Sequence, residues 1–247
     1  MPTSAELRNN YQRFTRNYLT DLAIRIEDPS ESDEVFLRSY KRLTSLNSWQ
    51  EFVVKRKASD EAYAFFIEAH NDAVSSHVLA RIGSWRAALQ SLRSCLENVF
   101  FCEYYKDHPV ELRLWCDGKH RITFSEMVAY FKVHPDFFSL PAQFVDFSQI
   151  QREYSTLSRA VHASARSFRM TASDTKTIIW EKDAAKLNMW DSRQREVIML
   201  LNYFLLTSYR TEVNGARLPG LRKAIGYSLD NEDHRTRVKE ILGVNIL

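Results

Sequence analysis

Apolar residues recur at helical spacing along most of this chain. Three helices are expected at 5–26, 32–46 and 48–57. Residues 60–107 contain no proline and one glycine, Gly83, and their apolar positions alternate steps of four and three. This heptad seam predicts one long helix, or two helices that break near Gly83, packed lengthwise against neighbours in a bundle. The seam consists of Val78, Ile82, Trp85, Leu89, Leu92, Leu96 and Val99.

The second half of the chain predicts shorter elements. Prolines interrupt residues 109–150, where a short helix at 123–132 is expected between loops. Residues 171–180 are rich in β-branched side chains and favour a short strand or an extended connection. Further helices are expected at 147–170, 190–212, 217–227 and 231–242.

The pattern as a whole favours an all-α protein, an antiparallel helical bundle. With six glycines and six prolines in 247 residues, the chain has few of the turn residues that a sandwich, a barrel or a glycine-punctuated nucleotide-binding sheet requires. No internal repeat or linker stands out. We therefore expect an N-terminal helical extension over 1–59 and one bundle domain over 60–247 that ends in short helices.

The segment from about residue 150 to residue 169 separates apolar from chemically active side chains. Its apolar stripe consists of Ile150, Tyr154, Leu157, Val161 and Phe168. Another stripe carries arginines seven residues apart with polar neighbours, namely Arg152, Arg159 and Arg166 beside Ser155, His162 and Arg169. The net charge is only +3, so any attraction to nucleic acid has to come from such local clustering. This segment predicts a surface for an anion or for RNA.

A second polar row lies beside the heptad seam. Arg86, Gln90, Arg93 and Glu97 follow one another at steps of four, three and four. One interpretation is an ordinary ion pair between Arg93 and Glu97 within one helix. The other interpretation places Arg93 opposite His162, where Glu97 fixes the guanidinium and the arginine holds a phosphate.

His162 itself permits two interpretations. It can be a hydrogen-bonded structural residue, with the nearby arginines forming a solvated face that pairs with acidic neighbours such as Glu153. Alternatively, a neutral imidazole accepts the proton of a 2′-hydroxyl that attacks its own phosphodiester, while the arginines stabilise the charge on the phosphate. The second chemistry requires no metal ion.

Other chemistries lack their motifs. No spacing typical of zinc sites occurs among Cys102, Cys116, His108 and His120. The chain also lacks glycine-rich phosphate loops and the Gly-x-Ser-x-Gly motif. We therefore expect neither a metal ion nor a cofactor. The paired aromatics Phe137 and Phe138 are expected to pack in the core and at a helix end rather than to stack on bases.

Two motifs follow one another along the chain. Arg93 and Glu97 lie on a long helix, and after a variable aromatic stretch the pattern Tyr-x-x-Leu-Ser-x-x-x-His runs from Tyr154 to His162. Over about residues 60–212 this arrangement resembles the HEPN superfamily of helical-bundle proteins, which are common in prokaryotic toxin and antiviral-defence systems. The resemblance implies a bundle of four or five helices, a homodimer that brings two active helices together, and metal-independent endoribonuclease activity.

The resemblance also implies roles for individual residues. His162, Arg159 and Arg93 are the expected catalytic residues, and RNA-binding roles are expected for Arg152, Arg166, Arg169, Glu97, Ser158 and Tyr154. The family's usual signature has an arginine, a polar residue and a histidine, with four to six residues intervening. Here Arg159 is followed by Ala160 in place of the polar residue, and only two residues separate Arg159 from His162.

Two functions are therefore expected as alternatives. The first is an RNA-binding bundle that cleaves RNA as the effector of a phage-defence or toxin–antitoxin system, where a second protein is an expected partner. The second is a non-catalytic helical adaptor whose basic face docks an acidic protein or a nucleoprotein. In either case the His162 helices are expected to face each other across the two-fold axis of a homodimer.

The start of the chain and its most apolar segment bear on location. The first residues contain no cationic stretch that leads into an apolar run, which indicates that there is no signal peptide. Residues 197–206 form the most apolar segment, about half the length of a bilayer span. We therefore expect a cytoplasmic protein without a membrane partner.

Overall fold

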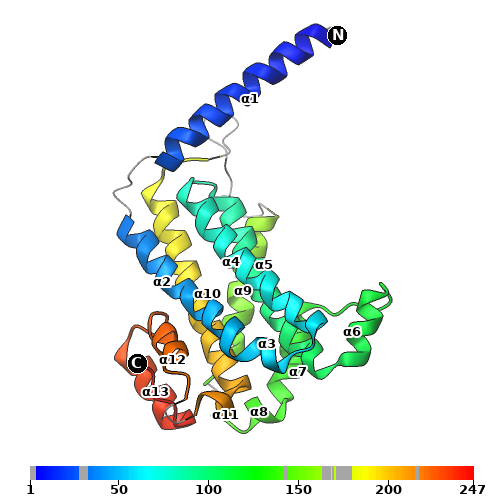
Figure 1. Cartoon of the computed structure of the whole chain (residues 1–247), viewed down its shortest axis with the longest axis vertical. Coiled ribbons are helices and arrows are strands. Elements are labelled where there is room, and N and C mark those ends of the chain that lie inside the picture. Colours follow the sequence, from blue (N-terminus) through cyan, green and yellow to red (C-terminus); the bar gives the residue numbers. More distant parts are fainter. Residues whose placement is uncertain are drawn as a thin grey trace.

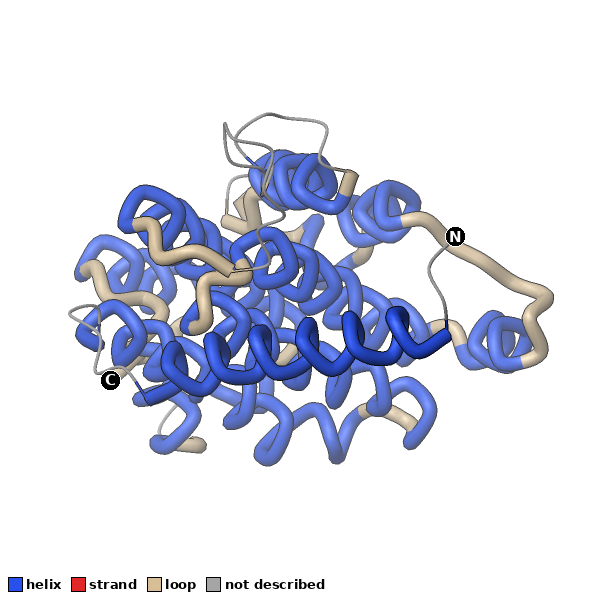
Figure 2. Tube along the Cα trace, turned by 90° about the horizontal axis from the view of Figure 1, so that it is seen from above, coloured by secondary structure: helices blue, strands red, loops and turns tan. Residues whose placement is uncertain are grey.

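The structure is a computed structural model and describes residues 4–27, 33–141, 144–162, 168, 170, 180–214 and 217–247. These residues form helices and loops, with no strand among them (Figure 1, Figure 2). The prediction of an all-α helical bundle is confirmed. Apart from Trp180, the predicted strand or extended connection at 171–180 lies outside the described residues. No helix in the described ranges has the length and apolar character needed to cross a membrane.

Five helices of 15 or more residues form the body of the bundle in the described chain, and each packs against at least two of the others. They are α2 (Asp33–Trp49), α4 (Asp60–Arg81), α5 (Trp85–Asp107), α9 (Phe147–Val161) and α10 (Ala184–Ser208). The central helix is α5, which contacts α4, α9 and α10. The remaining elements are α1 (Ser4–Glu27), the π-helical η1 (Gln50–Val54), α3 (Lys55–Lys57), α6 (Pro109–Cys116), α7 (Phe124–Val133), α8 (Pro135–Phe138), α11 (Arg210–Val213), α12 (Pro219–Gly226) and α13 (Glu232–Leu242).

Gly83 separates α4 from α5, so the heptad seam forms two helices rather than one. Its φ of +79° belongs to the left-handed region, and its carbonyl oxygen accepts a hydrogen bond from Glu181 N at 3.0 Å. The seam is buried after the break but not before it. Val78 is exposed, whereas α4 buries small residues that include Ala73 and Ala80. The close packing of α4 on α5 therefore depends on buried alanines, which are not part of the predicted heptad seam.

Gly83→Ala is expected to lower the free energy of unfolding by about 2–3 kcal/mol. A left-handed φ costs a residue with a Cβ about 1–2 kcal/mol. The new Cβ would also lie 2.3 Å from the carbonyl oxygen of Glu181, and this overpacking adds about 1 kcal/mol or more. Gly118→Ala is the matched control, because Gly118 has a φ of +70° but no atom within 4 Å of an added Cβ. Equal losses in urea unfolding for the two variants would contradict the contact with Glu181.

The helix α2 belongs to the same core as the later helices. Trp49 is fully buried and donates its indole N–H to Asn202 Oδ1 at 2.8 Å. Arg42 is also buried, donates from Nε to Gln194 Oε1 at 2.7 Å and forms an ion pair with Asp191. Of the expected N-terminal extension, α1 extends away from the bundle in Figure 1, whereas α2 is packed into it.

Prolines and a capping side chain shift several helix boundaries from their predicted positions. Pro109 and Pro135 stand at the first positions of α6 and α8, two helices that were expected as loops. A proline at the first position of a helix costs no hydrogen bond, because the backbone N–H that proline lacks would have no partner within the helix there. The helix α10 begins earlier than expected because the Asp183 carboxylate accepts a hydrogen bond from Ala185 N at 2.8 Å.

Candidate functional site

Four of the predicted site residues meet where α9 packs on α5. Arg93 donates from Nε to Ser158 Oγ at 2.9 Å and from Nη2 to Glu97 Oε1 at 2.9 Å. Its Nη2 also donates to the hydroxyl of Tyr154, which in turn donates to Glu97 Oε1 at 2.7 Å. The guanidinium carbon lies 4.6 Å from the centroid of the Tyr154 ring, within the range of a cation–π contact. We call these four residues the Arg93 cluster.

The Arg93 cluster fixes α9 on the bundle. The arginine and glutamate side chains are 24% and 20% exposed and neutralise each other. Burial, followed by the hydrogen bond and charge of Glu97, raises the pKa of Tyr154, so the phenol stays protonated as a donor. Tyr154 also stacks on Phe124 of α7, with ring centroids 4.1 Å apart. Arg93 thus contacts α9 at Tyr154 and Ser158, about two turns and one turn before His162.

The arginine that reaches the end of α9 is Arg86. Its Nε donates to the carbonyl oxygen of Ala160 at 3.1 Å and its Nη2 to that of Val161 at 2.6 Å. Carbonyl groups in the last turn of a helix lack backbone partners, so this side chain completes the helix end. The helix is therefore shorter than predicted, and His162 is its C-cap residue, with its backbone N–H donating to Ser158 O at 3.1 Å.

An exposed polar stripe runs along α9 on the side away from the core. It follows steps of four, three, four and three, and we call it the α9 stripe: Ser148, Arg152, Ser155, Arg159 and His162. The buried face of the same helix consists of Phe147, Ile150, Glu153, Leu157 and Ala160. Spacing alone had placed Arg152, Arg159 and His162 on this side of the helix. The other two arginines assigned to the surface, Arg166 and Arg169, lie outside the described residues.

Four residues of the α9 stripe, all except His162, line an open depression of about 510 Å³ whose lining lies entirely on α9. The side chain of Arg152 is 62% exposed, with Asp146 Oδ2 at 3.6 Å, and Arg159 donates to Thr156 Oγ1 at 3.3 Å. Among the described residues, the lining holds two guanidinium groups, three hydroxyls and an amide but no carboxylate: Ser148, Gln151, Arg152, Ser155, Thr156 and Arg159. This set of donors suits the oxygen atoms of an anion.

Two further observations define the charge of this surface. Glu153, the acidic residue nearest to the stripe in sequence, is buried and accepts a hydrogen bond from Arg193 of α10 at 2.6 Å. His162 is exposed, whereas the other six histidines of the chain are half-buried. The surface therefore presents an accessible imidazole at the end of a row of cationic and hydroxyl groups.

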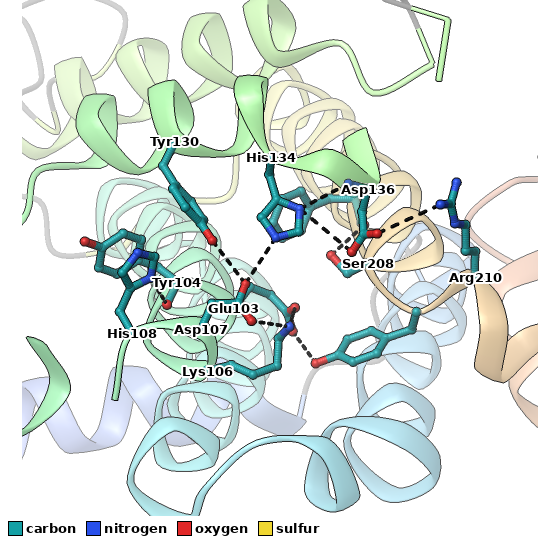
Figure 3. A network of polar contacts seen from close by, with 12 residues as sticks. Glu103, Tyr104, Lys106, Asp107, His108, Tyr130, His134, Asp136, Ser208 and Arg210 are labelled. Carbon is teal, nitrogen blue, oxygen red and sulfur yellow. Dashed lines mark hydrogen bonds and ion pairs between the residues drawn. The ribbon is translucent and has the colours of Figure 1, made fainter. Parts of the chain in front are cut away.

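A second polar cluster, at the carboxyl end of α5, was not indicated by any motif (Figure 3). Glu103 is fully buried and accepts a hydrogen bond from the Tyr209 hydroxyl at 2.6 Å. Its other oxygen, Oε2, lies 3.7 Å from Lys106 Nζ, which also pairs with Asp107 at 3.0 Å. Burial raises the pKa of Glu103 to about 7, although Lys106 and Tyr209 act in the opposite direction.

The same cluster continues from Asp107 to α7 and α8 (Figure 3). Asp107 Oδ2 lies 3.5 Å from His134 Nε2 and accepts a hydrogen bond from the Tyr130 hydroxyl at 3.4 Å. His134 Nδ1 accepts one from Asp136 N at 3.3 Å. Within the described residues, no three histidine, cysteine or acidic side chains are grouped so as to hold a metal ion. We interpret this cluster as a structural connection between helix ends.

Comparisons of the chain with protein-family models, with curated proteins and with solved structures gave no match.

Proposed function

We propose that this protein binds RNA through the α9 stripe and cleaves it with His162 as the base. The lining of the depression supports RNA binding, because its guanidinium and hydroxyl groups can donate hydrogen bonds to phosphate oxygens. Arg152 and Arg159 stand roughly 10 Å apart along the helix axis, at about 1.5 Å per residue. This spacing lets them contact different phosphates of one strand.

The exposed position of His162 supports the cleavage part of the proposal. Its imidazole takes the proton of a ribose 2′-hydroxyl, the 2′-oxygen forms a bond to phosphorus, and the bond to the 5′-oxygen breaks. The 5′-oxygen takes a proton from water as it leaves, and the imidazolium of His162 returns its proton to the solvent, so the products end in a 2′,3′-cyclic phosphate and a 5′-hydroxyl. Arg159 stabilises the charge on the phosphate oxygens, and no step requires a metal ion.

Four residues that were expected to act on RNA or to bind it have a structural role instead. Arg93, Glu97, Tyr154 and Ser158 are positioning residues, because their polar groups bond to one another and hold α9 on α5. The groups that contact RNA in their place are the hydroxyls and the amide of the depression, namely Ser148, Gln151, Ser155 and Thr156. The resemblance to the HEPN superfamily supports an effector role in a phage-defence or toxin–antitoxin system.

Replacing Arg152 and Arg159 by alanine tests the RNA-binding part. Each substitution is expected to weaken RNA binding and to reduce the slope of log affinity against log salt by about 0.7, the value for one phosphate contact on a single strand. Arg56→Ala is the matched control, because Arg56 is an exposed arginine on α3. Anisotropy titrations over a range of salt concentrations provide the measurement. Unchanged slopes for both variants would show that the α9 stripe does not contact phosphates.

A non-catalytic adaptor is the second candidate function, and one observation favours it. Large apolar side chains are exposed on α1: Leu7, Tyr11, Phe14, Leu19 and Ile24. Exposed apolar groups on one helix are typical of a contact with another protein. An adaptor would bind its partner protein in the presence or absence of RNA, and Arg152→Ala and Arg159→Ala would leave RNA affinity unchanged.

A further inference from the structure

We infer that RNA bound along α9 inserts one unstacked base into a pocket beside the α9 stripe. This inference rests on the proposed function and identifies the substrate as single-stranded RNA. The pocket measures about 300 Å³ and is formed by α7, by α8, by Leu140, Pro141, Val145 and Asp146 between α8 and α9, and by the start of α9. Its lining includes Lys132, Phe137, Phe138, Asp146 and Ser148.

Phe138 supplies the surface on which a base can stack. Its side chain is 79% exposed, in contrast to its neighbour Phe137, which is buried and stacks on Phe204 with ring centroids 5.1 Å apart. Phe137 therefore packs in the core as expected, whereas Phe138, at the end of α8, leaves most of its ring exposed. A base that covers the exposed ring removes apolar surface from water, and every base offers a flat face for this contact.

The pocket is continuous with the proposed phosphate-binding surface. Ser148 lines both the pocket and the depression along α9. Lys132 Nζ donates to Gln151 Oε1 of the depression at 3.4 Å, and Asp146 Oδ2 lies 3.6 Å from Arg152. A strand whose phosphates follow α9 toward its amino end therefore reaches the pocket without leaving the protein surface.

The polar groups of the pocket favour bases that carry an exocyclic amino group. Asp146 Oδ1 accepts the backbone N–H of Gln149 at 2.8 Å, whereas the side chain as a whole is half exposed. Its Oδ2 can accept a hydrogen bond from an amino group, and Lys132 can donate to a ring carbonyl. Cytosine presents both groups, whereas uracil has no amino group. Bases paired within a duplex are excluded, because their edges and faces are already occupied.

The test compares Phe138→Ala with two RNA probes that cannot be cleaved. A short 2′-O-methyl oligocytidine and a 2′-O-methyl duplex both lack the attacking hydroxyl. Phe138→Ala is expected to lower affinity for the oligocytidine by about ten-fold or more, the usual effect of losing one base–aromatic stack. Affinity for the duplex is expected to stay within about two-fold of the wild type. Phe138→Trp should retain oligocytidine binding, because an indole also stacks.

Val133→Ala is the matched control, because Val133 is a neighbouring apolar residue whose side chain is 72% exposed. It should not change the affinity for either probe. If Arg152→Ala weakens binding and Phe138→Ala does not, the base pocket is rejected and the RNA-binding surface stands. Equal effects of Phe138→Ala on both probes also reject the pocket. If the wild-type protein binds neither probe, the proposed function and the pocket are rejected together.

Discussion

His162→Ala is expected to slow RNA cleavage by about two to four orders of magnitude and to leave RNA affinity nearly unchanged. The imidazole acts on the proton that leaves the 2′-hydroxyl, whereas binding depends on Arg152, Arg159 and the hydroxyls around them. Cleavage by the wild-type protein should persist in EDTA and should produce 2′,3′-cyclic phosphate ends. Gel analysis of a labelled RNA and end-group analysis of the products measure both properties.

The folded state of the variant decides how a loss of cleavage is interpreted. His162 is exposed, and the hydrogen bonds that cap α9 at this residue come from its backbone N–H, so the melting temperature is expected to match the wild type. A variant that melts far below the wild type would favour a structural role for His162. A wild-type protein that binds RNA and leaves it intact would remove the enzymatic part of the proposal and retain the binding part.

Helices with one clear apolar face could be predicted from the sequence, because the helical repeat alone specifies which positions are buried. The break at Gly83 was also predictable as one of two alternatives. Two helices that start at Pro109 and Pro135 were not predicted, because a proline that opens a helix and a proline in a loop look alike in sequence. The buried face of α4 was not recognised because it consists largely of alanines, including Ala73.

The part of the candidate site that lies on one helix could be predicted from the sequence. The contacts between two helices could not. Arg159 and His162 share the α9 stripe through spacing alone. The contacts of Arg93 with Ser158 and of Arg86 with the end of α9 depend on how α5 and α9 pack, which spacing does not specify. The pocket could not be predicted either. The sequence does not show whether a phenylalanine such as Phe138 is exposed or buried.

A buried carboxyl group is expected to make this protein less stable as the pH rises. The pKa of Glu103 in the folded protein is about 7, against an ordinary value of 4.5. Between these two values the folded state holds a proton that the unfolded state has lost, so the free energy of unfolding falls as pH increases through this range. The difference between the two pKa values corresponds to roughly 3 kcal/mol, all of it lost above about pH 7.

Glu103→Gln is expected to remove this dependence on pH. The amide oxygen can still accept the hydrogen bond of Tyr209, but the side chain no longer titrates. The variant and the wild type should have similar free energies of unfolding at about pH 5, and the variant should be more stable by roughly 3 kcal/mol at about pH 8. Urea unfolding at both pH values measures this, with Glu240→Gln, at an exposed position on α13, as the matched control. A difference that does not change with pH would mean that Lys106, 3.7 Å from Glu103 Oε2, keeps the carboxylate ionised in the folded state.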